Sequence, residues 1–224
     1  MIRLLKRDFY LTRKSAILAL VFFVYALLNN ILSKGYDSSF STEILIAGFL
    51  LLVVVIEDYR DNGLSFVQTL PFTSTEYVVS RHLFILICST IVCALSFGLD
   101  WLFICLKHVD CEEYGISLWS MLNGCAQTWC FLILFYAILL FLFSIFRMEI
   151  AVVVTFAIEA AFMLGILKLL GSISYNPLGE MTPFQKWYYG LSEQKVFFGS
   201  VCITIVLYLI FMFITTLFMK KKEY

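Results

Sequence analysis

The chain has 224 residues and no net charge, and 62% of its residues are hydrophobic while only 14% are charged. Water-soluble domains are about 45–50% apolar and about 25% charged, so this composition excludes a soluble enzyme and predicts a protein that crosses a membrane several times. No basic or acidic tail is long enough to indicate a nucleic-acid partner.

Residues 1–14 combine basic and apolar side chains at a spacing typical of a short helix in the lipid headgroup region. A charged anchor that only sets the orientation of the chain is the open alternative. Residues 15–32 are apolar and form the first predicted span, because about 20 residues cross the hydrocarbon core.

The second and third spans enclose a long charged break, residues 57–82. The second span, residues 43–56, is short. The third begins after Thr73, because Thr73 and Glu76 have the spacing of a capping box, in which the hydroxyl and the carboxylate each accept a free backbone N–H. Pro71 ends the preceding segment. The third span runs to about Leu106, roughly 50 Å at 1.5 Å per residue, so its first turns stand in the cytosol.

Three further apolar stretches, residues 118–146, 150–170 and 197–219, complete six predicted spans. The loop 171–196 contains the aromatic run Trp187, Tyr188 and Tyr189. This loop either closes the exit of a pathway or anchors the chain at the membrane surface, and both interpretations stay open. The predicted fold is an all-α polytopic membrane protein with six transmembrane helices, in which residues 1–224 form a single transmembrane domain.

The orientation follows from the Lys and Arg side chains, because cytosolic loops carry an excess of them. If the N-terminus is cytosolic, eleven of the sixteen fall on the cytosolic side: Arg3, Lys6, Arg7, Arg13, Lys14, Arg60, Arg81, Arg147, Lys220, Lys221 and Lys222. We therefore expect both termini in the cytosol, together with residues 57–72, and an extracellular loop at 171–196.

No enzymatic site is expected. The sequence lacks a phosphate-binding loop of the Gly-x-x-x-x-Gly-Lys-Ser/Thr type, so the chain does not hydrolyse nucleotide by itself. Glu112 and Glu113 begin like an intramembrane protease motif, but Ser117 stands where that motif needs an arginine. His82 and His108 fall on opposite membrane faces, so neither can assist the other. We predict no catalytic residue, no metal and no cofactor.

Glu159 is the one ionisable residue deep inside a predicted span. Such a residue is costly in lipid and is a functional candidate. It either faces a translocation path or binds a proton, or it packs against a hydroxyl group of a neighbouring helix.

The segment before the third span is the strongest functional candidate. Leu64, Val67 and Leu70 recur at three-residue spacing after a charged run, which is typical of a short amphipathic helix. A helical elbow of this kind can convert a push into a tilt of the adjoining spans. An interfacial helix that ties down a loop is the alternative from the residues alone.

The sequence of this segment resembles the small permease subunits of type-2 ABC exporters. The matching residues are Thr69-Leu70-Pro71, Glu76-Tyr77-Val78 and Arg81, while Ser74 stands where a basic residue is usual in that family. The basic N-terminal segment, the six predicted spans and the chain length are also similar to the family, so the resemblance extends over the whole chain.

The resemblance implies that residues 57–72 are a coupling segment that docks on a separate ABC ATPase subunit. The implied ATPase-coupling contacts are Asp58, Tyr59, Arg60, Asp61, Asn62, Leu64, Phe66 and Val67. It also implies a second permease, in a homodimer or a heterodimer, and a place among the lipids of a bacterial inner membrane. The expected function is ATP-driven export, for which an amphipathic peptide or a lipid-like molecule is a suitable substrate. A secondary transporter that uses Glu159 and a regulatory membrane scaffold without an ATPase are the alternatives.

Overall fold

The computed structural model describes residues 2–32, 48, 73–107, 117–171 and 190–222. Four sequence predictions fall outside these residues. They are the second span at 43–56 apart from Gly48, the coupling segment at 57–72 with all eight of its predicted contacts, the residues His108, Glu112 and Glu113 after the third span, and the aromatic run Trp187-Tyr188-Tyr189.

Six helices make up the described part of the chain, and no strand occurs among these residues, so the all-α prediction is confirmed there. The bounds of the helices are α1 Ile2–Leu11, α2 Arg13–Leu32, α5 Ser74–Lys107, α6 Leu118–Ile145, α7 Met148–Gly171 and α9 Glu193–Lys222. Helix α9 begins four residues before the predicted sixth span, so part of the expected loop 171–196 is helical.

Three stretches within these helices are long and apolar enough to cross a membrane: Ser74–Leu106, Leu118–Ile145 and Glu193–Lys221. Helices α2 and α7 are also apolar and are 20 and 24 residues long. The chain is therefore a membrane protein, and the count of six spans stays a prediction because the second span lies outside the described residues.

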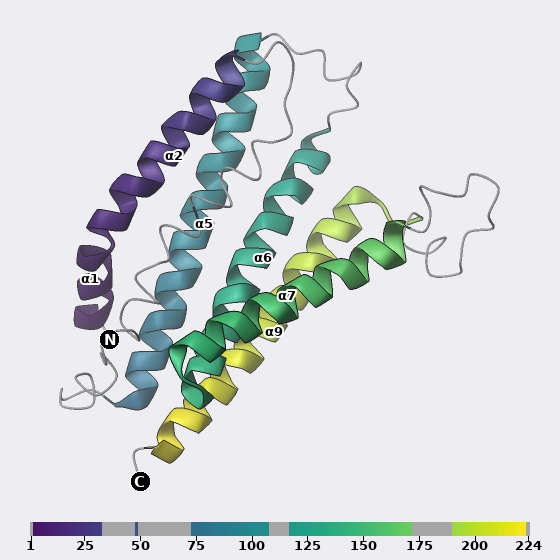
Figure 1. Ribbon diagram of the computed structural model, residues 1–224. Coiled ribbons are helices and arrows are strands. Elements are labelled where there is room, and N and C mark those ends of the chain that lie inside the picture. The colour runs from purple at the N-terminus through teal and green to yellow at the C-terminus, as the bar shows by residue number, and fades with distance from the viewer. Residues whose placement is uncertain (1, 33–47, 49–72, 108–116, 172–189, 223–224) are drawn as a thin grey trace.

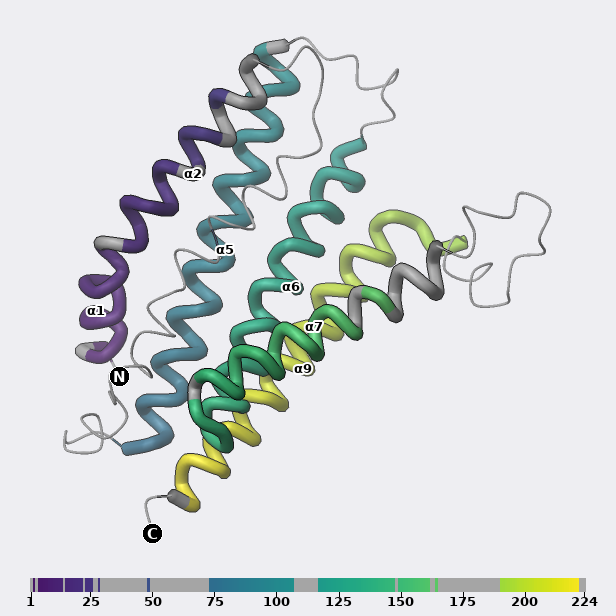
Figure 2. The backbone as a smooth tube through the Cα atoms, viewed as in Figure 1, coloured from purple at the N-terminus to yellow at the C-terminus, as the bar shows by residue number. Residues whose placement is uncertain are grey.

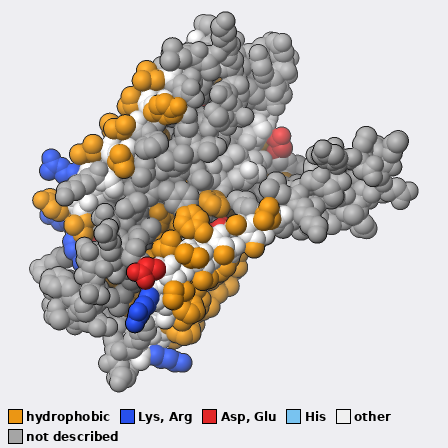
Figure 3. Space-filling model, viewed as in Figure 1, with side chains coloured by type: hydrophobic (Ala, Val, Ile, Leu, Met, Phe, Trp, Pro, Cys, Tyr) orange, Lys and Arg blue, Asp and Glu red, His pale blue; other side chains and the backbone are white. Residues whose placement is uncertain are grey.

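Helices α1, α2 and α5 run away from one end of the bundle, α6 returns to that end, α7 leaves it again and α9 returns to it (Figure 1). The N-terminus, the start of α5, the junction of α6 with α7 and the C-terminus all lie at one end, which we call the terminal end. The Lys and Arg side chains visible in Figure 3 lie over α1, over the α6–α7 junction and near the C-terminus, while apolar side chains cover the helices between the two ends. The side of the membrane on which the terminal end lies stays a prediction.

Helix α6 is the centre of the bundle and lies between α5 and α9 (Figure 2). Of its most apolar stretch 56% is buried, against 17% of the corresponding stretch of α9. The main apolar core joins α5, α6 and the start of α7 through Phe84, Ile85, Cys88, Phe135, Tyr136, Leu139, Leu140, Leu142, Phe143 and Ala151. Helix α9 packs on α6 and α5 but keeps a broad apolar face on the outside.

Both long helices at the centre begin with a capping box. At α5, the Glu76 N–H donates to Thr73 Oγ1 and the Thr73 N–H donates to Glu76 Oε2, each at 3.2 Å, as the sequence predicts. At α6, Ser117 and Ser120 form the same reciprocal pair. The Ser117 hydroxyl also donates to Glu193 Oε2 at 2.6 Å, so the start of α6 is joined to the start of α9.

We expect Thr73→Ala to loosen the first turn of α5. Loss of an N-cap side chain costs about 1 kcal/mol, which makes local opening roughly fivefold more frequent. Hydrogen exchange in detergent, followed by mass spectrometry, measures this as faster exchange over residues 74–78. Thr75→Ala is the control, since Thr75 is not the cap; equal exchange rates in the two variants would contradict the role of the box.

Candidate functional site at the start of α5

The second and third turns of α5 bury polar side chains that a membrane helix would ordinarily leave in water. Ser80, Arg81 and His82 are exposed by 1%, 1% and 0%. A buried charge requires a partner, so the neighbouring helices must supply polar groups at this level of the bundle.

Helix α1 supplies the partner of Arg81. Leu4 and Asp8 lie one turn apart on one face of α1, Thr12 follows directly after the helix, and all three are buried. Arg81 Nη1 lies 3.2 Å from Asp8 Oδ1, and both side chains are 1% exposed. Arg7 Nη2 lies 3.3 Å from the same oxygen and is partly exposed.

An aromatic contact supports this ion pair. The rings of Phe9 and Phe84 meet edge to face, with their centroids 5.3 Å apart. Edge-to-face pairs add about 0.5–1.5 kcal/mol to the burial of their area. Helix α1 is therefore attached to α5 by one charged contact and one apolar contact, on consecutive residues of α1.

The pKa of Asp8 indicates that the ion pair determines the position of α1 more than it stabilises the fold. Burial raises the pKa of the Asp8 carboxyl above its ordinary value, although Arg81 and Arg7 both act to lower it. The free-energy cost of removing the carboxylate from water thus exceeds its favourable electrostatic interaction with the two guanidinium groups. A pair of this kind adds little net stability, but removing one partner is costly. It therefore fixes the position of α1 on α5.

Helix α9 contacts α5 one residue further on. The Tyr208 hydroxyl donates a hydrogen bond to the His82 carbonyl oxygen, and the two rings meet edge to face with centroids 5.0 Å apart. Both side chains are buried. We call Asp8, Arg81, His82 and Tyr208 the α5 anchor, because these four residues join α5 to α1 on one side and to α9 on the other.

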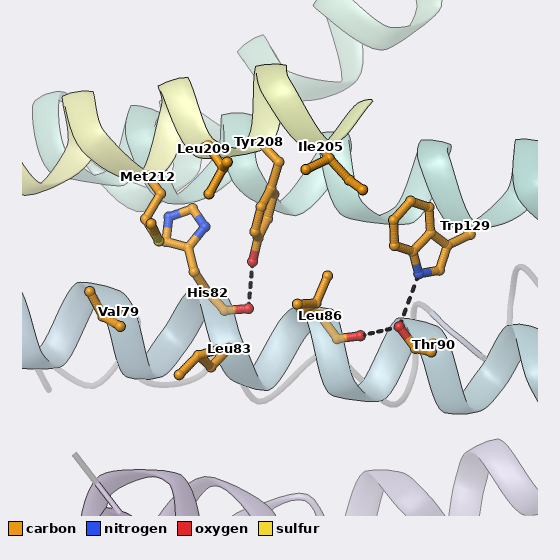
Figure 4. A pocket seen from close by; sticks show the side chains of 10 residues that line it. All are labelled: Val79, His82, Leu83, Leu86, Thr90, Trp129, Ile205, Tyr208, Leu209 and Met212. Carbon is orange, nitrogen blue, oxygen red and sulfur yellow. Dashed lines mark hydrogen bonds between the residues drawn. The ribbon is translucent and has the colours of Figure 1, made fainter. Parts of the chain in front are cut away.

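A groove of about 470 Å³ runs beside the α5 anchor, between α5 and α9 (Figure 4). Its polar groups at the end away from His82 bond to one another: the Trp129 indole N–H donates to Thr90 Oγ1 at 3.1 Å, and the Thr90 hydroxyl donates to the Leu86 carbonyl oxygen at 2.7 Å. The residues that line the groove are Val79, His82, Leu83, Leu86, Thr90, Trp129, Ile205, Tyr208, Leu209 and Met212.

Glu159, the predicted residue of a translocation path, lies on α7 and is 7% exposed. Thr155, one turn earlier, is fully buried, and its hydroxyl donates to the Ala151 carbonyl oxygen of the same helix. No hydrogen bond or ion pair joins Glu159 to another of the residues described. Glu159 is not part of the α5 anchor, and its role stays a prediction.

The α5 anchor was missed by sequence reasoning, which treated Arg81 as a cytosolic charge and His82 as a candidate without a partner. One signal was present: Asp8 is the single acidic residue in the basic segment 1–14. No local pattern pairs Tyr208 with His82, which stands 126 positions away. Across the described ranges, no group of three His, Cys, Asp or Glu side chains could hold a metal ion.

Comparison with known proteins gives one match. A family model described as ABC-2 family transporter protein matches residues 3–220. No curated protein matches the chain, and no solved structure does.

We expect Asp8→Asn to destabilise the fold by about 3 kcal/mol, because it leaves the Arg81 guanidinium buried beside an uncharged amide. Titration of the purified protein with SDS measures this as an earlier unfolding midpoint. Lys6→Gln is the control, since Lys6 is exposed on the same helix. The paired replacement Asp8→Leu with Arg81→Met should recover most of the loss. A paired variant no more stable than Asp8→Asn would contradict this account of the ion pair.

Proposed function

Because the chain belongs to the ABC-2 family of transporter proteins, we propose that it is the permease subunit of an ATP-driven exporter and works with a separate ABC ATPase subunit. The observation that carries the proposal is the α5 anchor. The predicted coupling segment 57–72 ends directly before the capped start of α5, and within the next nine residues α5 is joined to two other helices.

Motion of the coupling segment reaches the bundle through α5. The capping box orders the first turn of α5, which directly follows that segment in the chain. Further along, the Asp8–Arg81 ion pair and the Tyr208–His82 hydrogen bond join α5 to α1 and α9. Packed cores move between discrete arrangements rather than deforming continuously, so a push on the segment displaces these three helices together.

ATP hydrolysis belongs to the partner subunit in this proposal, because the sequence contains no phosphate-binding loop. Closure of two ATPase subunits on ATP would draw two permeases together, this chain being one of them in a homodimer or beside a different permease. In this proposal the terminal end, where both termini and the start of α5 lie, is on the cytosolic side of a bacterial inner membrane, as the excess of Lys and Arg at that end predicts. The substrate proposed is an amphipathic peptide or a lipid-like molecule, consistent with the apolar, aromatic lining of the groove.

A second candidate function rests on Glu159. This carboxyl is buried in α7 without a polar partner among the described residues, as expected of a group that carries a proton through a membrane. In that case, ion gradients would drive uptake into liposomes that contain no ATPase, and Glu159→Gln would abolish it. Export that depends on an ATPase and survives Glu159→Gln favours the first function.

The coupling segment is tested by Asp58→Lys combined with Phe66→Ala. We expect the variant to lose co-purification with its ATPase partner and to lower ATP turnover in proteoliposomes at least tenfold, because the change reverses a charge and removes an aromatic contact at the docking surface. Asp8→Asn is the matched comparison, since it should leave ATPase binding intact while reducing transport. If assembly and turnover are both unchanged in the double variant, residues 57–72 do not form the coupling element.

The proposed topology is tested with single cysteines in a variant that lacks the native ones. Arg147→Cys lies at the α6–α7 junction and Ser192→Cys directly before α9, and both positions are exposed. We expect a membrane-impermeant maleimide added to intact cells to label Ser192→Cys but not Arg147→Cys. Labelling should reverse in inverted membrane vesicles. The opposite pattern would place the terminal end outside.

A further inference from the structure

The groove between α5 and α9 has one unsatisfied polar side chain. At its far end the Trp129, Thr90 and Leu86 groups bond to one another. At its near end the His82 imidazole is 0% exposed, and neither Nδ1 nor Nε2 has a hydrogen-bond partner in the described part of the chain. In Figure 4 the ring points from α5 toward α9 and lies between Tyr208 and Met212. A buried polar group without a partner is unfavourable, so the imidazole marks where a ligand would place its own polar group.

The length of the groove matches one leaflet of a bilayer. Its α5 residues extend from Val79 to Thr90, which is about 16 Å along the helix at 1.5 Å per residue. One leaflet contributes about half of the 30 Å hydrocarbon core. Ile205 and Leu209 form an exposed rim on α9, at 43% and 49% exposure, so the groove opens to the side. His82 lies near the end of the groove that faces the terminal end of the bundle.

The groove is wide enough for a single hydrocarbon chain but too narrow for an α-helix. A volume of about 470 Å³ over 16 Å gives a mean cross-section of about 30 Å². A helix with its side chains is at least 10 Å wide and needs roughly 80 Å², so a helix of a second copy does not fit inside. A single hydrocarbon chain whose carbon atoms lie about 4–4.5 Å from the surrounding atoms needs a cross-section of roughly 20 Å² and therefore fits.

We propose that this groove binds one acyl chain of a membrane phospholipid, whose ester carbonyl accepts a hydrogen bond from the His82 imidazole. The chain lies along Leu86, Leu209 and Ile205, and its end reaches Trp129. Met212 lies beside the imidazole in Figure 4, and rotation of its flexible side chain opens the ring nitrogen to the ester. The site requires only that the chain lies in a membrane, so it is independent of the proposed ATPase.

Photo-cross-linking tests the position of the acyl chain. The purified full-length protein is placed in nanodiscs of phosphatidylcholine that carries a diazirine at the end of one acyl chain, and cross-linked peptides are mapped by mass spectrometry. We expect enrichment on residues 86–90 and 205–209. Ile205→Trp fills the groove and should lower that cross-linking at least fivefold. Ile203→Trp, the control, changes an exposed residue of the same helix that does not line the groove, and should leave it unchanged.

Native mass spectrometry tests the hydrogen bond. His82→Phe keeps a ring of similar size and removes both nitrogens, so we expect about tenfold weaker retention of an ester-linked phospholipid during detergent exchange. An ether-linked phospholipid lacks the carbonyl, and should be retained equally by the two proteins. The proposal is overturned by equal cross-linking in Ile205→Trp and Ile203→Trp, or by labelling spread evenly along α9. If His82→Phe does not fold, the Ile205→Trp comparison still decides.

Discussion

The arrangement of this bundle depends on one buried charge, the guanidinium group of Arg81. An arginine in the third turn of an apolar helix is unfavourable unless a carboxylate lies beside it. Among the residues that the structure describes, Asp8 of α1 is the carboxylate that forms an ion pair with Arg81. Helix α1 must therefore pack against α5. With α1 in place, Phe9 covers Phe84 and the opposite side of α5 is left for α9. The packing of α1 on α5 thus follows from the neutralisation of one side chain, while α9 is joined to α5 separately by Tyr208 and His82.

Hydropathy and capping rules predict the helices well, because these signals are local in the chain. The start of α5 after Thr73 follows from the spacing of two side chains, and the span that begins near Leu118 follows from composition. Contacts between helices are different, since Asp8 and Arg81 stand far apart in the sequence. Each also has an ordinary local explanation, Asp8 as part of the basic, amphipathic segment 1–14 and Arg81 as a cytosolic charge. Their pairing depends on the direction in which two helices cross, which periodicity does not encode. The coupling contacts from Asp58 to Val67 stay predictions.

The family assignment and the α5 anchor explain different parts of the mechanism. The family relates the chain to transport, whereas the anchor shows how a displacement at the start of α5 is shared among helices. The anchor contacts are few and specific: one ion pair, one hydroxyl-to-carbonyl bond and one edge-to-face ring pair, with the Phe9–Phe84 ring pair beside them. The α5 anchor therefore holds α1, α5 and α9 together at one level of the bundle and leaves the outer face of α9 in contact with lipid.

The buried ion pair also has a consequence for biogenesis. The ribosome completes α1 long before α5, and Arg81, near the start of α5, is costly to bury without the Asp8 carboxylate beside it. The N-terminal helix must therefore remain at the membrane surface, with its carboxylate accessible, until the third span emerges. A chain that loses its first ten residues loses the Asp8 carboxylate, the buried ion-pair partner of Arg81. Helix α1 thus assists the assembly of α5 into the bundle.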